Sequence, residues 1–174
     1  MEHAERRTAF RTPLPDRAIA GLSFRLADGL GPGDPVDATT LGAPILAHGR
    51  HKTFSLSIAD ISATGMSVVI HSPSFASRRP KSFTGRLVFL HLRGVYPDPD
   101  KEIECRLLAE TVTETLEGET LTLSMRFVAE ARPVTSQVHP VLFDIRKRGH
   151  DRLAAWCNLW FHHLLHEGGP SPAP

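Results

Sequence analysis

The chain has 174 residues, of which 41% are apolar, and its formal net charge is +1 at pH 7. This length and composition allow one domain with a hydrophobic core and a short appendage. The near-neutral charge excludes a broad DNA-binding surface, which needs a concentrated basic excess. The N-terminus is charged and no run approaches 18 apolar residues, so we expect no signal peptide, no membrane span and a cytoplasmic protein.

The N-terminal part predicts a leader, a first strand and a long loop. Residues 1–17 are polar and contain two prolines, which predicts a flexible, extended leader. Residues 18–26 favour a strand. Residues 28–44 are rich in Gly and Pro, which predicts a long loop. We interpret this loop as an insertion in a β-barrel domain that spans residues 18–134.

From residue 53 onward, apolar and polar residues alternate in the manner of half-buried strands. The strands predicted in this way cover Phe54–Ile58, Met66–Ile70, Ile103–Glu114 and Leu121–Phe127. Residues 86–92 predict a further strand, which is apolar on both faces. A turn near Gly118 joins Ile103–Glu114 to Leu121–Phe127 as a hairpin. Together with residues 18–26 they make six strands separated by short turns, which favours an antiparallel barrel or sandwich over a βαβ fold.

After Pro133 the pattern becomes helical, and we predict a C-terminal helical segment over residues 135–167. Its two helices are expected at Gln137–Arg148 and Asp151–His166. Trp156 and Trp160 fall on one face of the second helix, so this face either packs on the barrel or forms an interface with a protein partner or a second copy of the chain. Residues 168–174 are Gly- and Pro-rich and predict a disordered tail.

The two cysteines, Cys105 and Cys157, lie far apart in apolar surroundings. Buried free thiols are the expected outcome, because no disulfide framework is implied.

Two short patterns suggest a ligand site. The leader contains Arg7 and Arg11 as an R-x-x-x-R pair, and Asp60, Ser62 and Gly65 form a D-x-S-x-x-G turn between two predicted strands. Forked Arg donors match a phosphate or the O6/N7 edge of guanine. An Asp carboxylate suits the N1–H and N2–H donors of guanine, and glycine allows an unusual backbone or a close approach of the ligand.

Each pattern also has a structural interpretation. The arginines alone could be a solvated basic terminus. The turn alone could be closed by its own side chains, with Asp60 and Ser62 bonded to nearby backbone.

The conjunction of these motifs, in this order, resembles the PilZ domain family. The resemblance covers roughly residues 5–148, and it implies a six-stranded antiparallel Greek-key barrel with C-terminal helices. It also implies a bacterial signalling receptor that binds cyclic di-GMP, needs no cofactor, and passes ligand occupancy to an unidentified protein partner. On this resemblance Arg7, Arg11, Asp60, Ser62 and Gly65 would bind the ligand.

Arg6 and Arg126 are secondary candidates for ligand binding. About 48 residues separate Arg11 from Asp60, which is more than is usual in the family. The alternative function is therefore a PilZ-like protein–protein interaction module that does not bind nucleotide.

Catalytic and metal sites are not indicated. No nucleophile-elbow motif accompanies Ser62, so we expect no enzymatic activity. His162 and His166 are spaced one helical turn apart, but no further ligand completes a metal set, and we expect no metal.

Overall fold

The structure is a computed structural model that describes residues 11–37, 41, 44, 46–47, 49–50, 53–76 and 81–167. Within these residues the chain is mainly β, with two short 3-10 helices and one α-helix. The elements in chain order are η1 (Asp16–Ala18), β1 (Ile19–Leu26), β2 (Leu46–Ala47), β3 (Gly49–Arg50), β4 (Ser55–Ile61), β5 (Gly65–His71), η2 (Pro73–Ala76), β6 (Leu87–Val95), β7 (Glu102–Glu117), β8 (Thr120–Arg132), β9 (Val141–Asp144) and α2 (Asp151–Glu167).

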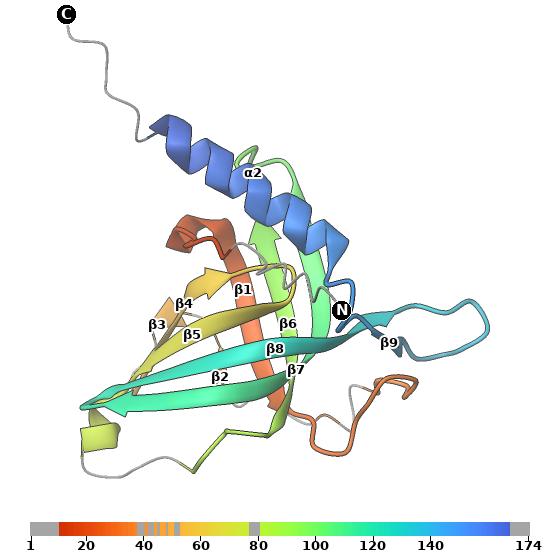
Figure 1. Ribbon diagram of the computed structural model, residues 1–174, viewed down its shortest axis with the longest axis horizontal. Coiled ribbons are helices and arrows are strands. Elements are labelled where there is room, and N and C mark those ends of the chain that lie inside the picture. The colour runs from red at the N-terminus through yellow and green to blue at the C-terminus, as the bar shows by residue number, and fades with distance from the viewer. Residues whose placement is uncertain are drawn as a thin grey trace, which may run out of the picture.

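The strands form one antiparallel sheet in the order β2-β1-β6-β7-β8-β5-β4-β3, and β9 also pairs with β8. The sheet curls into a half-barrel, and α2 lies across it (Figure 1). Its six long strands lie where the sequence predicted six strands. The turn at Gly118, where φ is +58°, joins β7 to β8 as expected.

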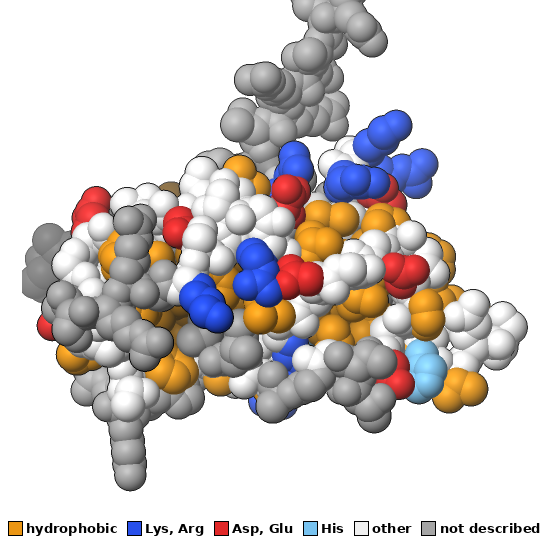
Figure 2. Space-filling model, turned by 90° about the horizontal axis from the view of Figure 1, so that it is seen from below, with side chains coloured by type: hydrophobic (Ala, Val, Ile, Leu, Met, Phe, Trp, Pro, Cys, Tyr) orange, Lys and Arg blue, Asp and Glu red, His pale blue; other side chains and the backbone are white. Residues whose placement is uncertain are grey.

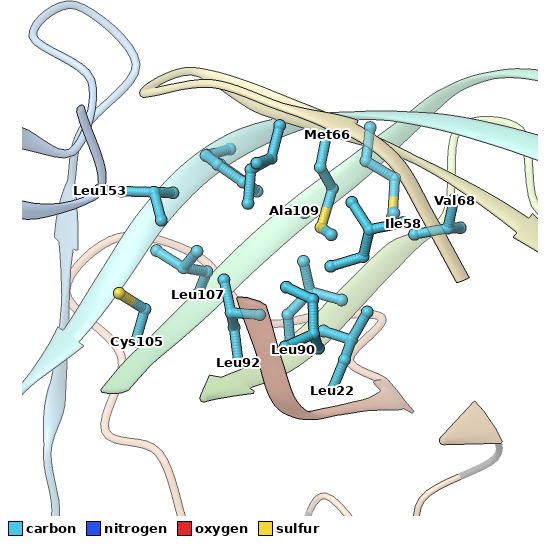
Figure 3. Close-up of a cluster of buried hydrophobic side chains, with 14 of the residues drawn as sticks. Leu22, Ile58, Met66, Val68, Leu90, Leu92, Cys105, Leu107, Ala109 and Leu153 are labelled. Carbon is cyan, nitrogen blue, oxygen red and sulfur yellow. The ribbon is translucent and has the colours of Figure 1, made fainter. Parts of the chain in front are cut away.

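The main core fills the inside of the curl. Alternate residues of each long strand point inward, as the twofold period of a strand requires. Leu22, Ile58, Met66, Leu90 and Leu107 come from five different strands and point toward one another there (Figure 3).

A second apolar cluster lies on the opposite face of the sheet. Phe89 and Leu108 point away from the main core, and the chain segment after β1 covers them together with β9. This segment is held by Gly33 N to Leu142 O and Leu142 N to Asp34 O, at 2.7 and 3.0 Å. The described part of the Gly/Pro-rich stretch 28–44 is therefore a structural cover, which explains why β6 is apolar on both faces.

Helix α2 closes the main core. Leu153, Trp156, Cys157 and Trp160 are at most 3% exposed and belong to the main cluster. Both indole Nε1 atoms donate to the carbonyl oxygen of Val95, at 2.9 Å from Trp156 and 2.7 Å from Trp160. The tryptophan face thus packs on the chain's own sheet, and these side chains leave no surface for the homodimer interface that the sequence suggested.

The helix predicted over Gln137–Arg148 is wrong. Residues 141–144 form β9, which pairs with Ala129–Arg132 of β8. Pro140 has no N–H to donate and disfavours a helix interior, and Leu142 gains a buried position in the second cluster. The predicted C-terminal helical segment 135–167 therefore contains a single described helix, α2. No helix in the described ranges is both long and apolar enough to cross a membrane.

Candidate functional site

A β-bulge in β4 turns Asp60 outward. Leu56 and Ile58 point into the core, so strict alternation would bury Asp60 as well. The register slips between Ile58 and Asp60, and Asp60 comes to lie opposite Ser67 of β5. The extra residue, Ala59, reverses the alternation. Ile61 then points inward and is fully buried, while the Asp60 side chain remains 30% exposed on the outer face.

Arg11 and Asp60 are brought together by the structure. Arg11 Nη1 donates to Asp60 Oδ1 at 2.7 Å and to Ser67 Oγ at 2.8 Å. Ser67 Oγ in turn lies 3.3 Å from Ser124 Oγ of β8. A polar row therefore runs across β4, β5 and β8 on the outside of the curl.

The leader is partly fixed beside this row. Thr12 is fully buried and forms an antiparallel bridge with Ile61, with N···O distances of 2.9 and 3.1 Å. Farther on, the Arg17 guanidinium pairs with Glu167 and lies 5.7 Å from the Trp160 ring centroid. In this structure the described part of the leader, residues 11–17, contacts the sheet and α2 through Thr12 and Arg17, and its flexibility stays a prediction. Arg6 and Arg7 lie outside the described residues.

Ser62 closes the turn between β4 and β5. Its side chain is 1% exposed; its Oγ donates to Gly65 O at 3.2 Å and accepts from Thr64 N at 3.3 Å. The backbone adds Ser62 N to Gly65 O at 2.9 Å. The structural interpretation of the motif therefore holds for Ser62, whose hydroxyl is engaged inside the protein, but not for Asp60, which contacts the Arg11 side chain.

Gly65 is required by close strand packing. A Cβ on this residue would lie 2.3 Å from the carbonyl oxygen of Met125 on β8. Its φ is not in the left-handed region, so the glycine is not needed here for an unusual backbone conformation. The backbone that approaches Gly65 in this structure belongs to β8.

A pocket of about 350 Å³ opens beside Arg11. Arg126 of β8, predicted as a secondary candidate, lines it, and its Nη2 donates to Glu110 Oε2 at 2.6 Å. Val112 lines it too, because a register shift between Thr111 and Thr113 leaves Val112 49% exposed. The pocket thus combines cationic, hydroxyl and apolar groups. The full lining is Arg11, Thr64, Val112, Thr113, Ser124, Met125, Arg126, Phe127 and Arg146.

Arg146 also lines this pocket, and sequence reasoning missed it. It lies in the connection between β9 and α2, where a helix was expected. Its Nε lies 3.1 Å from both carboxylate oxygens of Asp144, and its Nη2 donates to Asp144 Oδ2 as well. These hydrogen bonds from Arg146 lower the pKa of Asp144 to about 2. The only sequence signal was a basic run before α2, which carries no positional information.

The motif turn also meets the start of α2. His150 N donates to Ala63 O at 2.8 Å, and Gly149, with φ of +71°, packs against Ala63 and Thr64. His150 is buried; its Nδ1 accepts from Leu153 N at 3.1 Å, which places the ring proton on Nε2, 2.8 Å from Glu130 Oε1. The first turn of the helix is therefore fixed to the end of β4.

A larger pocket, of about 730 Å³, lies beside His150, and charges of both signs line it. Arg132 there is paired with Glu130, and Arg106 with Glu104, at 2.6 and 2.9 Å. Figure 2 shows the same mixture on one face of the molecule, where Lys and Arg side chains lie among Asp, Glu and hydrophobic side chains. The pocket at Arg11 differs, because none of its described lining residues is acidic.

Metal-binding chemistry finds no support in the described part of the chain, where no group of three or more His, Cys, Asp or Glu side chains is placed to hold an ion. His163 instead pairs with Glu167 at 3.2 Å and packs edge-on against Trp160.

No protein-family model matches the chain, and no curated protein matches it either. The candidate site therefore depends on its own geometry and chemistry.

Proposed function

We propose that the chain is a PilZ-type receptor that binds cyclic di-GMP on the outer face of β4, β5 and β8. The observation that carries this proposal is the contact between Arg11 and the outward-facing Asp60, at the edge of a pocket that Arg126 also lines. The curled antiparallel sheet, with a helix after its last strands, is compatible with the Greek-key barrel that the family resemblance implies.

The ligand chemistry matches these groups. Cyclic di-GMP carries two phosphates and two guanines. Of the two carboxylate oxygens of Asp60, only Oδ1 accepts a hydrogen bond from a described residue. Oδ2 can therefore accept from the N1–H and N2–H donors of a guanine. Toward the described residues Arg11 uses only Nη1, so Nη2 and Nε can donate to a phosphate or to the O6/N7 edge.

The position of the turn supports a receptor role. Ala63 and Thr64 lie beside Gly149 and His150, just before α2, and Thr12 links the leader to the end of β4. A ligand that draws Arg11 toward the pocket acts directly beside both segments. In this proposal, altered exposure of one of them is the change that a protein partner reads.

Titration with cyclic di-GMP tests the proposal. At a ligand concentration of about 100 Kd, the native state gains about 2.7 kcal/mol, which raises Tm by roughly 5–10 °C for a chain of this size. Arg11→Ala and Asp60→Ala each remove a charge-assisted contact of about 1.5–3 kcal/mol, so Kd should rise roughly 10- to 150-fold. Arg17→Ala is the matched control, since Arg17 lies on the same leader but contacts α2.

The alternative is a PilZ-like interaction module without a nucleotide ligand. It is favoured by the roles of Ser62 and Gly65, which the fold itself uses to close the turn and to pack β5 on β8. The fold requires residues with such roles whether or not a ligand binds. No Tm shift and no binding heat with cyclic di-GMP would favour this alternative over the receptor.

A further inference from the structure

The pocket beside Arg11 is lined by three arginines from distant parts of the chain. Arg11 comes from the leader, Arg126 from β8 and Arg146 from the connection between β9 and α2. No described acidic residue lines the pocket with them. Three cations around one cavity repel one another unless acidic groups or a bound anion compensate their charge.

Each of these arginines is held by its own carboxylate. Asp60 binds Nη1 of Arg11 at 2.7 Å, and Glu110 binds Nη2 of Arg126 at 2.6 Å. Asp144 engages Nε and Nη2 of Arg146. The three carboxylates compensate the positive charge and fix the direction of each guanidinium, which reduces the ordering cost on binding.

Each guanidinium keeps donors that no acceptor among the described residues uses. A guanidinium has five N–H groups, and a carboxylate on its Nε/Nη2 edge leaves both hydrogens of Nη1 and one of Nη2. Arg146 therefore retains the end-on pair that suits a phosphate. Among the described residues, no other protein acceptor is bound to these donors of Arg146.

The backbone around Arg146 is fixed on both sides. Ile145 N donates to Val128 O at 3.1 Å, and Gly149 N donates to Ile145 O at 2.7 Å. His150 N is bound to Ala63 O. The connection is therefore anchored to β8 and to the motif turn, and Arg146 is presented to the pocket from a short, hydrogen-bonded segment.

We propose that Arg146 is a third anion-binding arginine of this pocket and that the pocket takes a ligand with two phosphate groups. The proposal deepens the proposed function and rests on the same site. Arg11 and Arg126 face the pocket from the leader and from β8, and Arg146 faces it from the approach to α2. The hydroxyls of Thr113 and Ser124 and the exposed Val112 side chain supply neutral contacts between them.

Binding measurements on matched variants test this assignment. Arg146→Ala is compared with Arg148→Ala. Arg148 is an exposed arginine of the same turn, but it does not line the pocket. Arg146→Lys keeps the charge but loses the fork. Thermal unfolding without ligand checks that all three variants are folded, and calorimetry then uses two probes, cyclic di-GMP and inorganic pyrophosphate, with inorganic phosphate as the comparison with one phosphate group.

We expect Arg146→Ala to raise Kd at least tenfold for both probes, Arg146→Lys to restore only a small part of the loss, and Arg148→Ala to stay within about twofold. If the parent binds cyclic di-GMP and Arg146→Ala binds it equally well, Arg146 has no ligand role and the proposed function stands. If the parent binds pyrophosphate through Arg146 but not cyclic di-GMP, the anion site stands and the proposed function fails. Binding of neither probe, or equal affinity for pyrophosphate and phosphate, overturns the assignment.

Discussion

Replacing Gly65 with alanine tests whether β8 or a ligand requires the missing side chain. The added Cβ would lie 2.3 Å from the carbonyl oxygen of Met125 and 3.3 Å from its carbonyl carbon. Both are backbone atoms, so no rotamer change can relieve the contact. The oxygen must recede to at least 3.0 Å, and β5 and β8 must separate where Gly65 pairs with Arg126.

The expected cost follows from two effects. Overpacking of this kind costs about 1–3 kcal/mol. Weakening one neighbouring backbone bond, such as Phe127 N to Thr64 O at 2.8 Å, adds about 0.5–1.5 kcal/mol. Gly65→Ala should therefore lower the free energy of unfolding by about 1.5–4.5 kcal/mol, seen as a lower urea midpoint with an unchanged slope.

Gly31→Ala is the control for this experiment. Its Cβ would come no closer than 3.8 Å to Asp34 Oδ2, so the stability should change by less than about 0.5 kcal/mol. Equal stability of the two variants, with cyclic di-GMP binding lost only in Gly65→Ala, would refute the packing explanation and assign the glycine to the ligand.

Three further outcomes are expected. Gly94→Ala places a Cβ 2.5 Å from Trp156 Cζ2, so unfolding followed by tryptophan fluorescence should show a loss of about 1–3 kcal/mol; an unchanged midpoint would contradict the packing of α2 on β6. Deleting residues 151–174 uncovers the main core, so circular dichroism should show no cooperative unfolding, and a sharp transition in the truncated chain would refute the integral role of α2. Burial raises the pKa of Cys105 and Cys157 from 9.0 to about 12. Both thiols should therefore resist a disulfide reagent at pH 8 until urea unfolds the chain. The free energy of unfolding should also fall as pH rises from 9 toward 12, because the unfolded chain releases these protons at a lower pH than the folded one.

Most of the long strands were predictable because they have one face in the core and one outside, and β6 was predictable as an apolar run. The sequence located all six long strands within a few residues of their observed ends. The segment before α2 was not predictable in this way. Residues 141–144 have no lasting alternation, and they form β9 only because the end of β8 and the segment near Pro35 pair with them. Local propensity cannot report such distant partners.

The candidate site was predictable in part. The motif pointed to Arg11 and Asp60, and the structure places them in contact. The sequence left open whether Ser62 closes the turn or binds a ligand, and it could not indicate that Gly65 is crowded by Met125, because that contact depends on the neighbouring strand. Asp60 faces outward only through the bulge at Ala59, and a bulge has no simple signature in the sequence.

Net charge explains why Arg146 escaped sequence reasoning. A net charge of +1 excluded a broad basic surface, and that inference still holds. A pocket whose arginines are each balanced by a carboxylate adds almost nothing to the net charge. Its proposed capacity for anions comes from direction, since each carboxylate binds only part of its guanidinium, and other N–H groups have no acceptor among the described residues. Composition gives the number of charged side chains but not the direction in which each one points. A site of this kind is therefore recognised only in the structure, where Asp60, Glu110 and Asp144 lie beside their arginine partners.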